Sequence, residues 1–219
     1  VCSSPYYYAC GGGGYFGSGG SGCTSGCDES RTIKVVGGSS KLNSFDTYGS
    51  GGGSIVKVNT AHGGSGGGKI VINTKELKVD GTIRADGLST PSNTHRYAPG
   101  GGSGGRITIN TNILTIAGGA IISAFGGSGS FAYATAGSSL SYLRCGGGGS
   151  GGYIYINYLT GTTNERIGAT TKVDGGQPGY SGTLYCKPGE PGHIEIQTTS
   201  TKLKTSLSQN SITVEKNKN

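Results

Sequence analysis

The amino-acid sequence predicts an all-β fold, a glycine-rich parallel β-helix in which short strands stack coil upon coil. Three observations predict it. Alternating runs such as KIVI at 69–72 and RITI at 106–109 recur, glycine tracts precede them, and no window shows the 3.6-residue periodicity of an amphipathic helix. We therefore expect a β-solenoid over 31–197, between a Cys/Gly/Tyr-rich segment at 1–30 and a polar tail or exchanged strand at 198–219.

The strongest of these signals is an internal repeat. Alignment on the first isoleucine of each x-Ile-x-Ile strand makes Ile70, Ile107, Ile154 and Ile194 equivalent, with spacings of 37, 47 and 40 residues. Each copy begins with a Gly-rich run and a strand of the type x-Ile-x-Ile-Asn, followed by a turn that is often Asn-Thr. A second strand of the type Leu-x-Val-x-Gly-x-Ile-x-Ala and a Gly/Ser/Tyr-rich loop complete the copy.

The alternation within each strand explains why the copies should stack. Side chains two residues apart share a face, so Ile70 and Ile72 lie on one face while Lys69 and Val71 lie on the other. A single strand cannot bury such an apolar face, but stacked strands bury a continuous column. The unequal spacings are tolerated as surface loops, because each doubling of loop length costs only about 0.6 kcal/mol.

The glycine tracts recur in phase before each x-Ile-x-Ile strand. Because glycine has no Cβ, neighbouring chains can approach closely as extended, polyproline-II-like or tightly turned segments. The alternative is a set of flexible surface loops, and the regular phase favours packed tracts. A phosphate-binding loop at 101–106 is not favoured, because neither Gly-Lys-Ser/Thr nor a helix follows.

The overall composition argues against disorder and against several function classes. Glycine occupies 47 of 219 positions and proline 6, but the glycines are clustered and β-branched residues alternate between the clusters. The net charge of +7 is sparse and lacks the dense basic patch of a nucleic-acid-binding protein. It fits solubility or attraction to an acidic polysaccharide. No apolar run approaches the ~20 residues that span a bilayer.

The runs GGGSGGRITI at 100–109 and GTIRADG at 81–87 resemble the glycine-rich repeats of large extracellular proteins of protists, plants and bacteria. In that family GGGGSGG-x-I-x-I alternates with L-x-V-x-G-x-I-x-A-x-G. The resemblance covers about residues 50–197 and implies a right-handed parallel β-helix of the adhesin type at a cell surface. It carries no catalytic motif, so it implies no functional residue.

The six cysteines form two groups, and their even number fits an oxidising compartment. Cys145 and Cys186 are 41 residues apart, about one repeat, which predicts a disulfide between successive coils. The others lie near the beginning of the sequence, where their spacing is not that of a standard zinc finger and no histidine is close. We expect two disulfides to staple this N-terminal segment through Cys2, Cys10, Cys23 and Cys27.

Tyrosine, which occurs 13 times, supplies candidate contact residues. Tyrosine buries a large area with little loss of rotamer freedom, so an exposed cluster suits an assembly or ligand surface, whereas ordinary loop packing is the alternative. The alternating stretch at 211–215 could instead add a strand to a neighbouring subunit. The candidate contacts are Tyr6, Tyr7, Tyr8, Tyr153, Tyr155, Ile212 and Val214, with Tyr158 as a further tyrosine of this kind.

Catalysis is not expected. A polysaccharide lyase on this fold would need clustered carboxylates and a basic residue, for which the candidates are Asp80, Arg84, Asp86 and Asp174. Asp80 and Asp174 lie in matching Val-Asp-Gly sequences, which are typical of turns and favour a structural role. We predict no catalytic residue, no metal site and no cofactor.

The leading hypothesis is a structural subunit of an extracellular fibre or cell-surface coat, with copies joined head to tail through open solenoid ends. An adhesin or glycan-binding module is the main alternative. An ice-binding protein would need a regular threonine array, and Thr108, Thr111 and Thr115 are irregularly spaced. The expected partners are other copies of the chain and an acidic polysaccharide or glycan. Neither nucleic-acid binding nor membrane insertion is expected.

Overall fold

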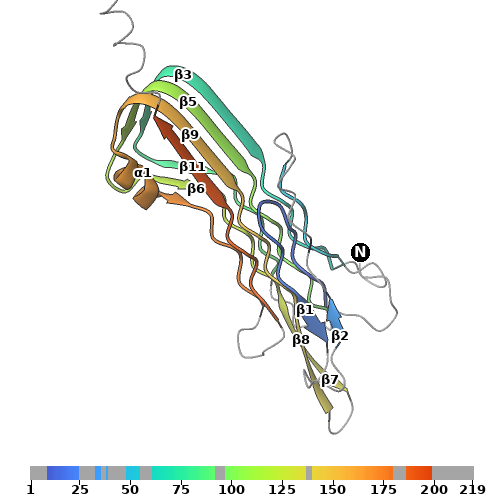
Figure 1. The fold of residues 1–219 in the computed structure, drawn as a ribbon. Helices are drawn as coiled ribbons and strands as arrows, with labels where there is room; N and C mark the ends of the chain where they lie inside the picture. Colours follow the sequence, from blue (N-terminus) through green and yellow to red (C-terminus); the bar gives the residue numbers. More distant parts are fainter. Residues whose placement is uncertain are drawn as a thin grey trace, which may run out of the picture.

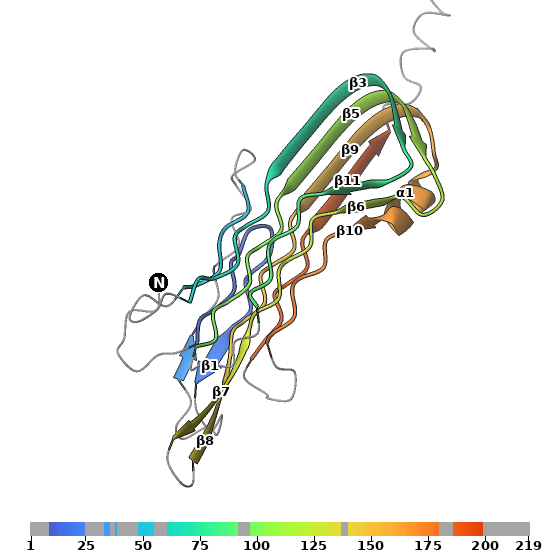
Figure 2. The same ribbon diagram turned by 180° about the vertical axis from the view of Figure 1, so that it is seen from behind.

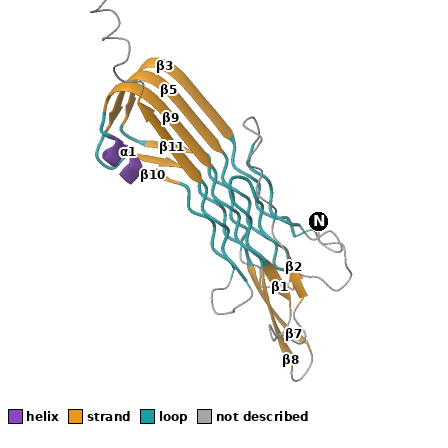
Figure 3. Cartoon of the chain, in the orientation of Figure 1, coloured by secondary structure: helices purple, strands orange, loops and turns teal. Residues whose placement is uncertain are grey.

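The computed structural model is a mostly β protein of elongated shape, with parallel sheets and one short helix (Figure 1). It describes residues 9–24, 33–35, 38, 48–54, 61–91, 97–136, 140–179 and 186–198. Strands gather toward both ends of the molecule, and extended segments without strand or helix run between them (Figure 3).

The elements are β1 (Gly22–Thr24), β2 (Ile33–Val35), β3 (Lys69–Val79), β4 (Thr82–Arg84), β5 (Arg106–Ile116), β6 (Ile121–Ser123), β7 (Phe131–Ala136), β8 (Leu140–Cys145), β9 (Tyr153–Gly161), α1 (Asn164–Thr170), β10 (Thr171–Lys172) and β11 (His193–Thr198).

A parallel four-stranded sheet with the order β11-β9-β5-β3 brings the sequence repeats together (Figures 1 and 2). Its register places equivalent residues of successive copies side by side. One column contains Ile70, Ile107, Ile154 and Ile194, and a second contains Ile72, Ile109, Ile156 and Ile196. The predicted alignment of the isoleucine pairs is therefore confirmed.

A parallel three-stranded sheet with the order β10-β6-β4 carries the second strands of the copies. Ile122 lies opposite Ile83 on one side and Thr171 on the other. The main hydrophobic core combines side chains from both sheets, among them Ile107, Ile109, Ile154, Ile156, Ile122 and Ala124. Burial of branched aliphatic side chains on this scale is the main driving force for such a stack.

Helix α1 departs from the all-β expectation. The Thr163 side chain caps its first turn by accepting a hydrogen bond from the Arg166 N–H, and Ile167 is fully buried in the core. In the third copy this helix precedes a second strand of only two residues, β10. The periodicity test missed α1 because seven residues span only about two turns.

The longest repeat also differs from expectation. Instead of an irregular loop between β6 and β9, β7 and β8 form an antiparallel pair, and β8 is joined through β1 to β2. This antiparallel sheet lies toward the end of the molecule opposite α1 (Figures 1 and 2). The additional residues of that copy thus include two antiparallel strands outside the parallel sheets.

The middle of the molecule is a bundle of extended, glycine-rich segments joined by backbone hydrogen bonds. Gly101 and Gly104 both donate to segment 146–152, so the bonds to one neighbour recur at every third residue. This is the period of the polyproline II helix. Segment 97–105 is hydrogen-bonded in this way to 9–14, 48–54, 61–68, 85–91, 124–130 and 146–152. The prediction of packed tracts is confirmed, and the alternative of flexible loops is wrong for these segments.

Close approach explains why the tracts are glycine. A Cβ at Gly148 would overlap the carbonyl oxygen of Gly176, and a Cβ at Gly101 would overlap that of Gly127. A left-handed backbone is not the reason, because the described glycines with positive φ are confined to Gly119 and Gly161. The tracts therefore require glycine because the bundle has no room for a Cβ, and not because of a special backbone conformation.

Two serines are accommodated inside the tracts because their hydroxyl groups serve backbone donors. Ser103 and Ser150 are fully buried. The Ser103 hydroxyl accepts a hydrogen bond of 2.7 Å from the Ser50 N–H, and the Ser150 hydroxyl accepts one of 2.9 Å from the Tyr15 N–H. Each serine hydroxyl thus accepts a hydrogen bond from the backbone of another segment, and the Tyr15 N–H also donates to the Gly17 carbonyl oxygen at 3.1 Å.

Candidate interaction surfaces

The outer face of the four-stranded sheet carries two of the candidate tyrosines, Tyr153 and Tyr155, but Tyr153 is covered. Only 4% of Tyr153 is exposed. Its ring stacks on Phe16 with centroids 4.4 Å apart, and the Arg106 guanidinium lies 5.3 Å from its centroid. The expectation that Tyr153 is exposed is wrong, because the 15–17 bend brings an aromatic side chain across it.

Tyr153 is also held by a hydrogen bond from its hydroxyl group to Glu195, at 2.6 Å. Burial, followed by this bond, raises the pKa of Tyr153 above its ordinary value. Conversely, the bond from Tyr153 is the largest cause that lowers the pKa of the Glu195 carboxyl group. The pair links β9 to β11 through their side chains as well as their backbones.

The other two tyrosines of β9 point in opposite directions. Tyr155 is half-buried on the outer face, where its hydroxyl group donates to Gln197 at 3.0 Å. Tyr158 is 4% exposed and belongs to the main core, and burial raises its pKa. Of the three, Tyr155 is therefore the one that retains a surface for contact. Tyr6, Tyr7, Tyr8, Ile212 and Val214 lie outside the described residues.

A row of amide side chains crosses the same face. Asn73, Asn110, Asn157 and Gln197 occupy equivalent positions, and the Asn110 side-chain amide donates to the Asn73 oxygen at 2.8 Å. The turn predicted at Asn-Thr is absent from β3 and β5, which continue through these residues. The recurrence of asparagine directly after x-Ile-x-Ile was the available signal for the row.

The second candidate surface is the end of the stack that carries β3 and β4. There most of the inner side chains are half-buried, although Val79 at the end of β3 is buried. The inner side chains of the central strands β5, β6 and β9 are buried. The partly exposed residues are Ile70, Ile72, Leu77 and Ile83. At the opposite end, Ile194 and Ile196 of β11 are likewise half-buried.

Comparison with protein-family models, curated proteins and solved structures finds no match.

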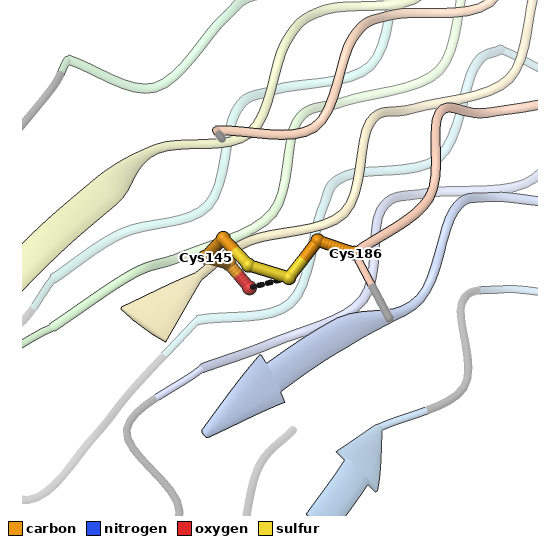
Figure 4. Close-up of a disulfide and its surroundings, with 2 residues drawn as sticks. All are labelled: Cys145 and Cys186. Atoms are coloured by element: carbon orange, nitrogen blue, oxygen red, sulfur yellow. Dashed lines mark hydrogen bonds between the residues drawn. A yellow bond between two sulfur atoms is a disulfide. The ribbon is translucent and has the colours of Figure 1, made fainter. Parts of the chain in front are cut away.

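The predicted disulfide between Cys145 and Cys186 is present, with the Cα atoms 6.2 Å apart (Figure 4). It joins the last residue of β8 to the segment that leads into β11, and both residues are buried. Cys10 is disulfide-bonded as well. The side chains of Cys2, Cys23 and Cys27 are outside the described part, so the predicted N-terminal pairing stays a prediction.

Two of the carboxylates considered for lyase chemistry, Asp80 and Asp86, have local partners. Asp80 forms an ion pair of 3.2 Å with Lys78. Asp86 pairs with Arg84 at 2.6 Å and accepts a hydrogen bond from the Phe125 N–H at 2.8 Å. These contacts fit structural roles within one strand and between neighbouring strands.

The described residues contain no cluster of three or more histidine, cysteine, aspartate or glutamate side chains that could hold a metal ion. Among them, no helix has the length and apolar character required to cross a membrane. The threonines considered for ice binding do not share one open face, since Thr111 is buried whereas Thr115 is exposed.

Proposed function

We propose that this chain is a structural subunit of an extracellular fibre or cell-surface coat, built as a β-solenoid whose copies associate through the ends of the stack. The supporting observation is the contrast between the central and terminal coils. Ile107 and Ile109 are fully buried between neighbouring strands, whereas their equivalents Ile70 and Ile72 have a strand on one side and are only half-buried.

An end of this kind favours association for two reasons. An outer strand has unpaired backbone groups along one edge, which can form hydrogen bonds with another chain. The half-buried isoleucines add a gain of roughly 25 cal/mol for each Å² of apolar surface that the contact removes from water. The disulfides and the glycine lattice support an extracellular, mechanical role, because they link segments that lie far apart in the sequence.

Electron microscopy and sedimentation over a range of concentrations test the proposal. The wild-type chain should form assemblies, and Ile72→Glu on the inner face of β3 should remain monomeric. Val71→Glu is the matched control, because Val71 is 49% exposed on the outer face of the same strand. Thermal melting of each variant separates loss of assembly from loss of folding. Dispersed wild-type monomers at every concentration would contradict the proposal.

Glycan binding is the second candidate, and the polar outer face of the sheet favours it. Tyr155, Gln197 and Asn110 lie on neighbouring strands there and present an aromatic ring beside amide groups. In an affinity-retardation assay with an acidic polysaccharide, Tyr155→Ala should lose retention. Tyr153→Ala should retain binding unless the substitution also damages the fold, because Phe16 covers Tyr153 and keeps its ring from a ligand. Equal retention of wild type and Tyr155→Ala would exclude this face as the binding site.

A further inference from the structure

The segments that lead into β3, β5, β9 and β11 form one row of the glycine bundle. In this row, each of the first three segments donates hydrogen bonds to the next through N–H groups spaced by three residues: those of Gly64, Gly67, Gly101, Gly104, Gly148 and Gly151. The strand register pairs His193 with Tyr153, so the equivalent positions of the last segment are five and two residues before His193. They are Pro188 and Pro191.

The prolines remove the donors that would point out of the stack. In residues 187–192, all residues except the two prolines use their N–H groups for hydrogen bonds back into the bundle. The donors Lys187, Gly189, Glu190 and Gly192 bond to the carbonyl oxygens of Ser21, Gly176, Ser18 and Val173, respectively. Proline lacks an N–H but suits the extended backbone of the row. Residues 187–192 consequently offer no N–H to a further segment, and this end of the row is closed.

The opposite end of the row is open. Within the described residues, no hydrogen bond reaches the carbonyl oxygens of Gly63 and Gly66 or the N–H groups of Ser65 and Gly68. Ser65 and Gly68 are exposed. In the inner segment 97–105, the equivalent groups are all bonded to neighbouring segments. The open face thus presents both donors and acceptors.

These differences decide how two copies can meet. Head-to-tail contact would place Pro188 and Pro191 against the carbonyl row of Gly63 and Gly66, where the acceptors find no N–H. Two open faces, by contrast, can supply donors and acceptors to each other. The half-buried apolar side chains of β3 lie at the same end and would gain cover in the same contact.

We propose that the face formed by residues 61–68 is the docking surface for a second copy of this chain, which presents the same face in a two-fold contact. Pro188 and Pro191 close the other end against head-to-tail growth. The inference rests on the proposed self-association, but it changes the product. A two-fold contact closes on itself, so the chain would be the dimeric unit of a coat, whereas only a head-to-tail contact continues into a fibre.

Chemical cross-linking of the oxidised protein tests this arrangement. A short bismaleimide should convert Ser65→Cys into a covalent dimer. Lys187→Cys, exposed at the closed end, is the matched control and should remain monomeric. A mixture of the two should give no mixed dimer. In a second variant, Pro188→Gly with Pro191→Gly restores two donors, so oligomers longer than dimers and mixed Ser65–Lys187 cross-links should appear.

Mixed cross-links in the protein with both prolines would overturn the inference. Assemblies in the microscope without Ser65–Ser65 cross-links would overturn it as well, while leaving the proposed structural function in place. Dispersed monomers with no cross-links would contradict both proposals.

Discussion

Asn73 and Asn110 are joined through their side-chain amides by a hydrogen bond of 2.8 Å, although 37 residues separate them. The separation equals one repeat, and the backbones of the two residues are paired in register. The bond shows how a residue type repeated at one position connects successive copies of the repeat. A shift by one residue would break it and would also turn the isoleucines out of the core.

Replacement of Asn110 by alanine should lower the free energy of unfolding by about 0.5–1.5 kcal/mol, the net value of one such hydrogen bond. Thr115→Ala is the control, because Thr115 is exposed on the same strand. Chemical denaturation followed by circular dichroism measures both. Equal stability of the two variants would show that the amide row does not stabilise the stack.

Gly148→Ala should destabilise the protein by about 1–3 kcal/mol or prevent folding, because the added methyl group would overlap a carbonyl oxygen inside the bundle. Gly51→Ala should have little effect, since a Cβ there would make only an ordinary contact of 3.5 Å with Gly64. Thermal melting compares the two. A glycine bundle that accepted alanine at position 148 as readily as at position 51 would not be packed as described.

Removal of the Cys145–Cys186 disulfide by a double serine substitution should cost about 4 kcal/mol in the loop-entropy account, since it releases a loop of 41 residues. The melting temperature of the variant should fall correspondingly. A reductant should lower the melting temperature of the variant less than that of wild type. An unchanged melting temperature would mean that the bundle alone fixes these two segments.

The Tyr153–Glu195 pair should give stability a pH dependence above pH 10. Since the pKa of Tyr153 is raised in the folded protein, its contribution to stability is complete below the unfolded value of about 10 and declines as the pH rises above it. Between pH 9 and pH 11, the melting temperature of Tyr153→Phe should therefore fall less than that of wild type. Parallel curves would contradict this assignment.

Glu195 should give stability a pH dependence in the acid range. Its pKa is lowered in the folded protein, so its contribution is present above the ordinary glutamate value and is lost as the pH falls through the lowered one. Glu195→Gln should flatten the decline in melting temperature in that acid range. If wild type and this variant decline equally, the carboxylate has no such role.

The sequence predicted those parts of the fold that depend on repetition. Ile70, Ile107 and Ile154 stand at the same point of a recurring pattern, so their stacking followed from the need to bury one face of each strand. Cys145 and Cys186 were predictable for a related reason, because their separation matched one repeat. Glycine tracts in phase with the strands likewise indicated close packing of the segments that carry them.

The parts that depend on contacts outside the repeat were not predictable in the same way. Phe16 covers Tyr153 from a distant position in the sequence, and no local pattern announces it. Helix α1 is too short to show a periodicity, yet it places Ile167 in the core. The role of Pro188 became visible only when the strand register aligned it with Gly148.

The glycine tracts form a hydrogen-bonded lattice that continues the stacked strands. Amide hydrogen exchange measures it most directly. The N–H groups of Gly101, Gly104, Gly148 and Gly151, each bonded to another segment, should exchange as slowly as those of β5. The amides of Ser65 and Gly68 should exchange faster under conditions in which the chain is monomeric. Exchange of all these glycines at the rate of an unstructured peptide, beside a protected β5, would contradict the account.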